Sequence, residues 1–257
     1  MKNLIVPSFL ISVCFGLFPA FGQQEVSLAD DPLNAQRAYY NWFDAQVGIE
    51  NTALFNGIRY KELYRVNGDL HKFYKSPDFL IGDLVYQGQP YFDQQLKYDL
   101  YEDEIIVQLT SQSGSSIMKL IKDQIDAFHI EGKHFYHLRG LQLNKSKENI
   151  DGFYELMHEG TALKLFKKNK KIQNKVLEKK VVYYQFRAKD EYYLLYNDLF
   201  YPVKSKSDFL KIFPNNKKQI NDYFASNKYL MKTDYDAFIL QAALKVDAAL
   251  TSNKAAL

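Results

Sequence analysis

LKYDLYEDEIIVQLT, residues 96–110, is the stretch that decides the fold class of this sequence. Leu96, Tyr98 and Leu100 alternate with polar residues before a short acidic turn, and the alternation resumes at Ile105 after it. Apolar residues with a period of two on both sides of a short turn are typical of two antiparallel strands with one buried face. The stretch therefore predicts a β-hairpin whose opposite face meets water.

The same period of two extends over about residues 57–204, in short runs rich in Tyr, Phe, Ile, Val and Leu. Because strands in hairpins do not alternate with helices, the pattern favours an antiparallel sheet over a doubly wound parallel one. We expect about eight to eleven strands in a curved sheet or an open barrel. Dipeptides that favour tight turns separate the runs: Asn67-Gly68, Gln87-Gly88, Glu102-Asp103, Ser113-Gly114, Glu131-Gly132, Asp151-Gly152, Glu159-Gly160 and Asn197-Asp198.

Helix signals lie on either side of this strand region. Asp31 before Pro32 is a helix start, and apolar residues follow it at spacings of three and four. After the sheet, Ser205 with Asp208 predicts a capping box, and helical patterns continue to about residue 251. The predicted fold class is α+β, mainly antiparallel β: a curved multi-stranded sheet or open barrel with one N-terminal helix and two to three C-terminal helices.

Residues 1–22 have the pattern of a signal peptide. Lys2 supplies a positive charge, an apolar run starts at Leu4, and Ala20-Phe21-Gly22 is a small-x-small cleavage site. A transmembrane anchor is the alternative, but the run is barely long enough to span a bilayer. We expect an exported protein, periplasmic or extracellular after cleavage, in which residues 23–257 form a single β-rich domain with no transmembrane segment.

The composition argues against several classes of function. The chain has 257 residues, with 33 Lys and Arg against 30 Asp and Glu, and its one cysteine, Cys14, lies in the predicted signal peptide. A formal charge of +3 argues against a strongly basic nucleic-acid-binding protein. One cysteine argues against a disulfide scaffold or a thiolate metal centre. We therefore expect no cofactor and no nucleic-acid partner.

Three histidines, His129, His134 and His137, are the first candidates for a metal site or a general base. His134 and His137 are three residues apart and therefore point to opposite faces of a continuous strand. A turn at Glu131-Gly132 would place His129 opposite one of them as a cross-strand pair. The spacing favours partly exposed strand histidines over a metal site.

Motifs for hydrolysis are incomplete. The sequence has no G-x-S-x-G motif, and Ala162 stands where a zincin that began at His158 would have its second histidine. Paired carboxylates for a glycosidase could come from the acidic turn, but exposure at a hairpin tip keeps pKa values ordinary. We interpret the acids of this turn as solvated residues: Asp99, Glu102, Asp103 and Glu104. The catalytic residues stay unassigned.

A run of lysines lies between two predicted strands, with Glu178 as its single acid. A cationic loop of this kind can attract anionic lipid, lipopolysaccharide phosphate, nucleic acid or an acidic partner. The simpler interpretation is a long, mobile hairpin tip kept in solution by its lysines. The candidate binding residues in this run are Lys167, Lys168, Lys170 and Lys171.

Aromatic residues are the unusual part of the composition, because Phe, Trp and Tyr make up 16% of the chain. Packing explains most of them, since Tyr and Phe fit the half-buried surface of a sheet. Tyr192, Tyr196 and Tyr201 remain as candidate binding residues, because aromatic residues fall on both faces of their predicted hairpin. A concave aromatic surface there would suit an apolar or sugar ligand.

Several segments resemble one family: residues 51–60 (NTALFNGIRY), 86–93 (YQGQPYFD), 96–101 (LKYDLY), 152–156 (GFYEL) and 206–220, which begins with KSDFL and ends with KKQI. The resemblance is to secreted proteins of Bacteroidetes bacteria that have no assigned function. It covers most of the chain after the predicted signal peptide. It implies a cell-envelope location and transfers no activity.

No motif for catalysis survives, whereas aromatic residues are abundant. The sequence favours a secreted or periplasmic non-enzymatic binding protein whose partner is an envelope protein or an apolar or sugar ligand. Two alternatives stay open: a hydrolase whose site is assembled from residues distant in the sequence, and a half-barrel lipid carrier of the cell envelope. A deep pocket lined by histidine and a carboxylate would favour the hydrolase, and an open trough would favour binding.

Overall fold

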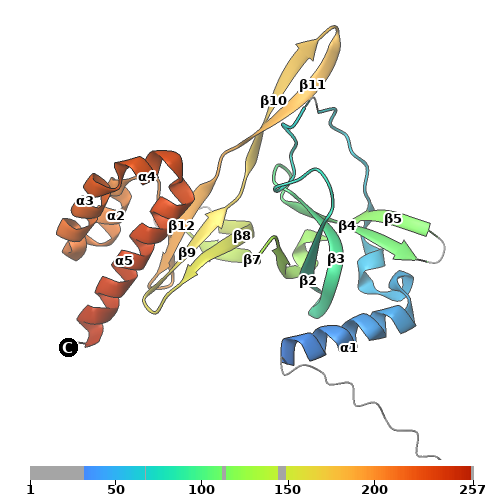
Figure 1. Cartoon of the computed structure of the whole chain (residues 1–257), viewed down its shortest axis with the longest axis horizontal. Coiled ribbons are helices and arrows are strands. Elements are labelled where there is room, and N and C mark those ends of the chain that lie inside the picture. Colours follow the sequence, from blue (N-terminus) through green and yellow to red (C-terminus); the bar gives the residue numbers. More distant parts are fainter. Residues whose placement is uncertain (1–31, 67, 112–113, 144–148, 256–257) are drawn as a thin grey trace, which may run out of the picture.

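The computed structural model describes residues 32–66, 68–111, 114–143 and 149–255. The predicted signal peptide lies outside the described residues, as do Asn67 and Ser113 of two predicted turns. Within them, an N-terminal helix leads into a large sheet, and a group of helices ends the chain (Figure 1). The predicted α+β fold class, dominated by antiparallel strands, is confirmed.

One sheet contains eleven strands, and every neighbouring pair in it is antiparallel. Most neighbours are joined by short turns, as the period-two runs predicted. The sheet is open, with β1 and β13 at its two edges. From one edge to the other its strands are β1 (Ile58–Arg59), β5 (Gly114–Lys119), β4 (Glu104–Ser111), β3 (Gln89–Asp99), β2 (Leu80–Tyr86), β6 (Ile125–Ile130), β7 (Lys133–Gln142), β8 (Asn149–Glu159), β9 (Leu163–Lys168), β12 (Glu191–Tyr196) and β13 (Leu199–Pro202).

The hairpin predicted over residues 96–110 forms between β3 and β4. Leu96 lies opposite Val107, and Tyr98 lies opposite Ile105. These four side chains are buried, because they belong to the inner face of the sheet. The alternation in the sequence therefore gives the register as well as the strands.

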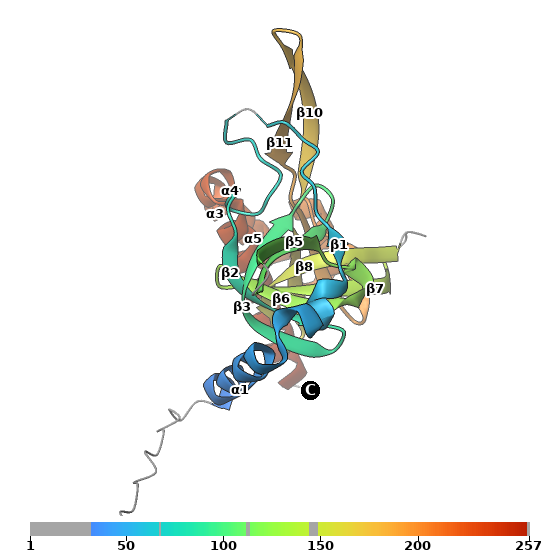
Figure 2. The ribbon, with the colours of Figure 1, turned by 90° about the vertical axis from the view of Figure 1, so that its right-hand side faces the viewer.

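The sheet curls between β1 and β8 (Figure 2), and a first core of buried side chains lies inside the curl. Its centre is a group of aromatic rings from four strands, Tyr98, Phe128, Phe135 and Phe153. The rings of Phe128 and Phe135 stack with their centroids 4.6 Å apart, and Tyr98 meets both edge to face. All four side chains are at most 3% exposed, so aromatic side chains fill the inside of the curl.

The other end of the sheet, β9 and β12, packs under the C-terminal helices (Figure 1). Leu194 faces the helices, and Leu195 on the opposite face packs against a third cluster around Phe166 and Phe200. Strand β12 is therefore covered on both faces. The helices are α2 (Lys206–Ile212), α3 (Lys217–Ser226), α4 (Lys228–Thr233) and α5 (Tyr235–Ala255).

Two local predictions change. Asp151-Gly152 was expected to form a turn, but it lies inside β8, and Gly152 has a φ of +131° there. The C-terminal helices are four rather than two to three, because the six-residue α4 forms between Asn227 and Asp234. The predicted N-terminal helix and the Ser205–Asp208 capping box are both present, the former as α1 (Pro32–Val47).

The two remaining strands form a separate sheet. β10 (Lys171–Glu178) and β11 (Val181–Ala188) pair along their whole length and project from the body as a β10–β11 arm (Figure 1).

No helix among the described residues has the length and apolar character that a membrane crossing requires.

Candidate functional site

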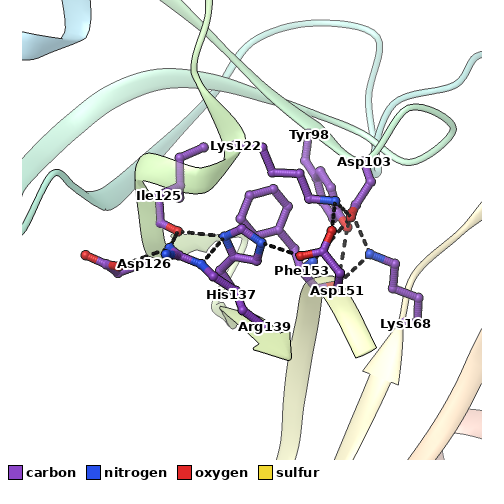
Figure 3. Close-up of polar contacts among 10 residues, drawn as sticks. All are labelled: Tyr98, Asp103, Lys122, Ile125, Asp126, His137, Arg139, Asp151, Phe153 and Lys168. Atoms are coloured by element: carbon purple, nitrogen blue, oxygen red, sulfur yellow. Dashed lines mark hydrogen bonds and ion pairs between the residues drawn. The ribbon is translucent and has the colours of Figure 1, made fainter. Parts of the chain in front are cut away.

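A polar cluster joins two strand pairs that are not neighbours in the sheet (Figure 3). Asp103, in the turn between β3 and β4, accepts a hydrogen bond from the Tyr98 hydroxyl at 2.7 Å. Its carboxylate also meets the ammonium groups of Lys168 on β9 at 2.6 Å and of Lys122 before β6 at 2.8 Å. In the strand order β3 and β9 are separated by β2, β6, β7 and β8, so these contacts link distant strands of the curled sheet.

The protonation of Asp103 follows from these neighbours. Burial alone would raise the pKa of its carboxyl, but the two lysine ammonium groups outweigh burial and hold the pKa below its ordinary value. Asp103 is therefore a carboxylate at neutral pH, and its charge is paired with the two lysine ammonium groups. The prediction that the acids of this turn are solvated with ordinary pKa values is wrong for Asp103.

Asp99 in the same turn region also departs from that prediction. Its side chain is 1% exposed and lies 2.7 Å from the Lys72 ammonium group. Burial raises the pKa of the Asp99 carboxyl, although Lys72 acts against the change. The backbone N–H groups of Tyr101 and Glu102 donate to it, so Asp99 also shapes the turn.

His137 extends the cluster along β7. Its Nε2 lies 3.3 Å from an Asp151 oxygen, and its Nδ1 lies 3.0 Å from the Arg139 Nε. The Nδ1 atom also lies 3.0 Å from the Ile125 carbonyl, which accepts a second hydrogen bond from the Arg139 Nη2 at 2.8 Å. The His137 side chain is fully buried although that of Asp151 is 60% exposed, so the imidazole itself offers no exposed atom to a substrate. The cluster is a structural clip.

The lysine run is not a loop, which corrects that prediction. Lys167 on β9 is 7% exposed and lies between Asp190 at 3.0 Å and Asp236 of α5 at 2.7 Å. Lys168 points to the other face and joins the polar cluster.

Two further lysines of the run help to fix the base of the β10–β11 arm. The Lys171 ammonium group donates to the carbonyls of His71 and Phe73. The backbone N–H of Lys170 donates to Asp190. These contacts are internal to the protein.

The three candidate tyrosines face the C-terminal helices. Tyr192 is 8% exposed and donates its hydroxyl to Asp236 of α5. The ring of Tyr196 lies 5.1 Å from that of Phe213, and Tyr201 packs against the same core. A ligand would reach Tyr192 only if the helices moved away from β12.

An apolar groove of about 140 Å³ lies on the outer face of four adjacent strands, β3, β2, β6 and β7. The period of two places alternate residues of these strands on this face, away from the first core. The groove is largely apolar, with a polar end that contains Asp83, His129 and His134. Its apolar walls include Val85, Pro90, Phe92, Ala127 and Tyr136.

The histidines of the groove form the cross-strand pair that the sequence allowed. His129 lies opposite His134 across the β6–β7 hairpin, with ring centroids 4.5 Å apart. Burial, and then the neighbouring His129, lower the pKa of His134. Within the described residues, no group of three or more His, Cys, Asp or Glu side chains is placed to hold a metal ion.

Helix α1 forms one rim of the groove. Arg37 donates two hydrogen bonds of 2.8 Å to the Asp83 carboxylate and stacks over the Phe92 ring at 4.8 Å. Burial would raise the pKa of Asp83, but the hydrogen bonds from Arg37 hold it below its ordinary value. Arg37 also bonds Asp93 at 2.6 Å, so the helix is fixed to β2 and β3.

An exposed aromatic row continues from the groove onto α1. The Tyr40 ring lies 6.1 Å from Phe92, and Tyr39 lies 5.8 Å from Tyr40 and 6.5 Å from Trp42. Tyr39 is 61% exposed and Trp42 is 59% exposed. The groove and this row form one surface, which we call the α1–groove surface.

Comparisons with protein-family models, with curated proteins and with solved structures found no match. The resemblance to secreted Bacteroidetes proteins therefore stays a prediction. The α1–groove surface is the candidate functional site, and His129 and His134 are its only residues that the sequence analysis singled out as candidates. A sequence signal existed for α1, where Tyr39, Phe43 and Val47 repeat at helical spacing.

Proposed function

We propose that this protein is an exported, non-enzymatic binding protein of the cell envelope that binds a partner protein through the α1–groove surface. The observation that carries the proposal is the apolar groove, continuous with an exposed aromatic row on α1. Exposed apolar surface with a polar end is typical of interaction sites. Export rests on the signal-peptide pattern of residues 1–22.

The size of the groove favours a side chain of a partner over a free ligand. Sites for small molecules enclose roughly 300–1,000 Å³, whereas this groove holds about 140 Å³. A cavity of roughly 150 Å³ accommodates a benzene-sized ring. The groove therefore fits one aromatic side chain, which would be the anchor of a larger interface that includes Tyr39 and Trp42.

The chemistry of the groove does not favour the hydrolase alternative. Among its lining residues there is no Ser, Thr, Cys or Lys to act as a nucleophile. The carboxylate of Asp83 already accepts two hydrogen bonds from Arg37. His129 lies 3.8 Å from Asp83, which is longer than a hydrogen bond.

The inside of the curled sheet bears on the lipid-carrier alternative. A lipid carrier needs an apolar cavity that admits an acyl chain. In the described part of the curl, Phe128, Phe135 and Phe153 occupy that space and are at most 3% exposed. The open groove therefore supports binding on the outer face.

An aromatic probe tests the groove directly. We expect N-acetylphenylalaninamide to shift the backbone NMR resonances of β2, β6 and β7 next to the groove. Ala127→Leu places a larger side chain in the groove and should weaken this binding by about tenfold or more. Ala225→Leu is the matched control, because Ala225 is exposed on α3 and far from the groove in the sequence.

Three results would contradict this proposal. The first is resonance shifts that are spread over the whole protein. The second is binding of the probe to Ala127→Leu as to wild type, and the third is binding of methyl glucoside in the groove in preference to the aromatic probe.

Trp42 is the only tryptophan in the chain. Its fluorescence gives an independent readout, since it lies in the same aromatic row.

A further inference from the structure

The β10–β11 arm extends well beyond the body of the protein, as Figures 1 and 2 both show. Its strands pair over eight residues each, from Lys171 opposite Ala188 to Glu178 opposite Val181. A two-stranded sheet that projects from a domain does not bury a core of its own. Its position therefore needs support at the base and an explanation at the tip.

The base of the arm is held firmly. Phe186 is 2% exposed, and its ring lies 5.5 Å from Tyr64 and 5.2 Å from Tyr101. Tyr184 meets Tyr64 at 5.1 Å. Together with the hydrogen bonds of Lys171, these contacts make the arm a braced projection rather than a loose loop.

The tip of the arm combines apolar and cationic side chains. Leu177 lies opposite Val182, so both side chains are on the same face. Leu177 is 72% exposed and Val182 is 45% exposed. Lys179 and Lys180 form the turn beyond them, and both are exposed. An exposed aliphatic pair bordered by lysines suits a surface with apolar and anionic parts.

The turn itself carries backbone strain. Lys179 has a φ of +47° and Lys180 has a φ of +66°, in the left-handed region that favours glycine and asparagine. The turns at Gln87-Gly88 and Glu131-Gly132 place glycine at the second such position. The arm instead holds two lysines there, at a backbone cost that glycine would avoid.

We propose that the tip of the β10–β11 arm docks on an anionic lipid surface. Leu177 and Val182 enter the boundary between headgroups and acyl chains, and Lys179 and Lys180 approach the lipid phosphates. This contact is separate from the α1–groove surface and does not depend on it.

The size and chemistry of the tip favour lipid over the other anionic partners. Two aliphatic side chains offer far less area than a stable protein interface, which buries roughly 800 Å² on each partner. A membrane surface needs no such area, because each lysine near it adds to the attraction. The tip, residues 177–182, has two lysines and one acid, Glu178, and includes no aromatic ring on which a nucleic-acid base could stack.

Vesicle binding tests the proposal. We expect the protein to sediment with vesicles of phosphatidylcholine mixed with phosphatidylglycerol, and not with vesicles of phosphatidylcholine alone. Added salt should weaken the binding. The double variant Lys179→Gln and Lys180→Gln should bind anionic vesicles at least about tenfold more weakly than wild type. Leu177→Ser with Val182→Ser should also weaken binding, but with the salt dependence retained.

The matched control is Lys217→Gln with Lys218→Gln, which removes the same charge from an exposed site on α3. It should bind vesicles as wild type does. The proposal is overturned if anionic vesicles are not bound, or if the control on α3 loses as much binding as the double variant of Lys179 and Lys180. It is also overturned if a short DNA duplex binds through the arm while vesicles do not. Unchanged thermal unfolding of each variant shows that the fold is intact.

Discussion

Gly152→Ala is expected to lower the free energy of unfolding by about 3 kcal/mol or more. A Cβ at this position would lie 2.3 Å from an Asp103 oxygen and 2.5 Å from the Lys168 ammonium nitrogen. Neither group can retreat at low cost, because Asp103 is held by Tyr98 and Lys122 as well. The substitution therefore disrupts the clip that links distant strands of the curled sheet.

A matched control separates this contact from backbone strain. Gly114 has a φ of +127°, close to the +131° of Gly152, and nothing lies within 4 Å of a Cβ built on it. Gly114→Ala should therefore cost only the backbone term, about 1 kcal/mol. Urea denaturation followed by circular dichroism measures both variants. Equal losses would mean that the space around Gly152 is not filled as described.

The turn predicted at Asp151-Gly152 is wrong because of these same contacts. Asp-Gly between apolar runs is a strong turn signal, and elsewhere in the chain such signals are correct, as at Gln87-Gly88. At Gly152 the glycine is required by Asp103 and Lys168, whose positions in the fold bring them against β8. A local pattern cannot reveal contacts that depend on long-range strand order.

Local signals were sufficient for the elements themselves. The alternation over residues 96–110 predicted the β3–β4 hairpin, and Ser205 with Asp208 predicted the start of α2. Each depends on residues within about one hairpin or one helical turn. The strand order β3-β2-β6-β7, which creates the groove, joins strands separated by residues 100–124 and has no such local signal.

The prediction for the lysine run was wrong for a related reason. The run was predicted to be a solvated hairpin tip, whereas Lys167 and Lys168 lie on β9, where adjacent side chains point to opposite faces. Both are instead paired, because Asp236 of α5 covers one face of β9 and Asp103 covers the other. Burial of a lysine is decided by the acids that the fold supplies, and these lie far away in the sequence.

Asp103→Asn is expected to destabilise the protein by about 3 kcal/mol at neutral pH. The neutral amide leaves the Lys168 ammonium group, whose side chain is 12% exposed, without the carboxylate that now lies 2.6 Å from it. Lys122 keeps Asp151 at 3.4 Å and loses less. Glu159→Gln is the control, since Glu159 pairs with Lys164 on the surface and exposed pairs contribute at most about 1 kcal/mol.

The dependence on pH gives this prediction its sharpest test. Because the pKa of Asp103 is lower in the folded protein than in the unfolded chain, its contribution to stability is complete at neutral pH. The contribution is lost as the pH falls below the ordinary carboxyl range and through the lower folded value. Asp103→Asn lacks this carboxyl, so its unfolding free energy should fall less steeply in acid than that of wild type. Parallel acid profiles for the two proteins would show that Asp103 does not carry the charge that links these strands.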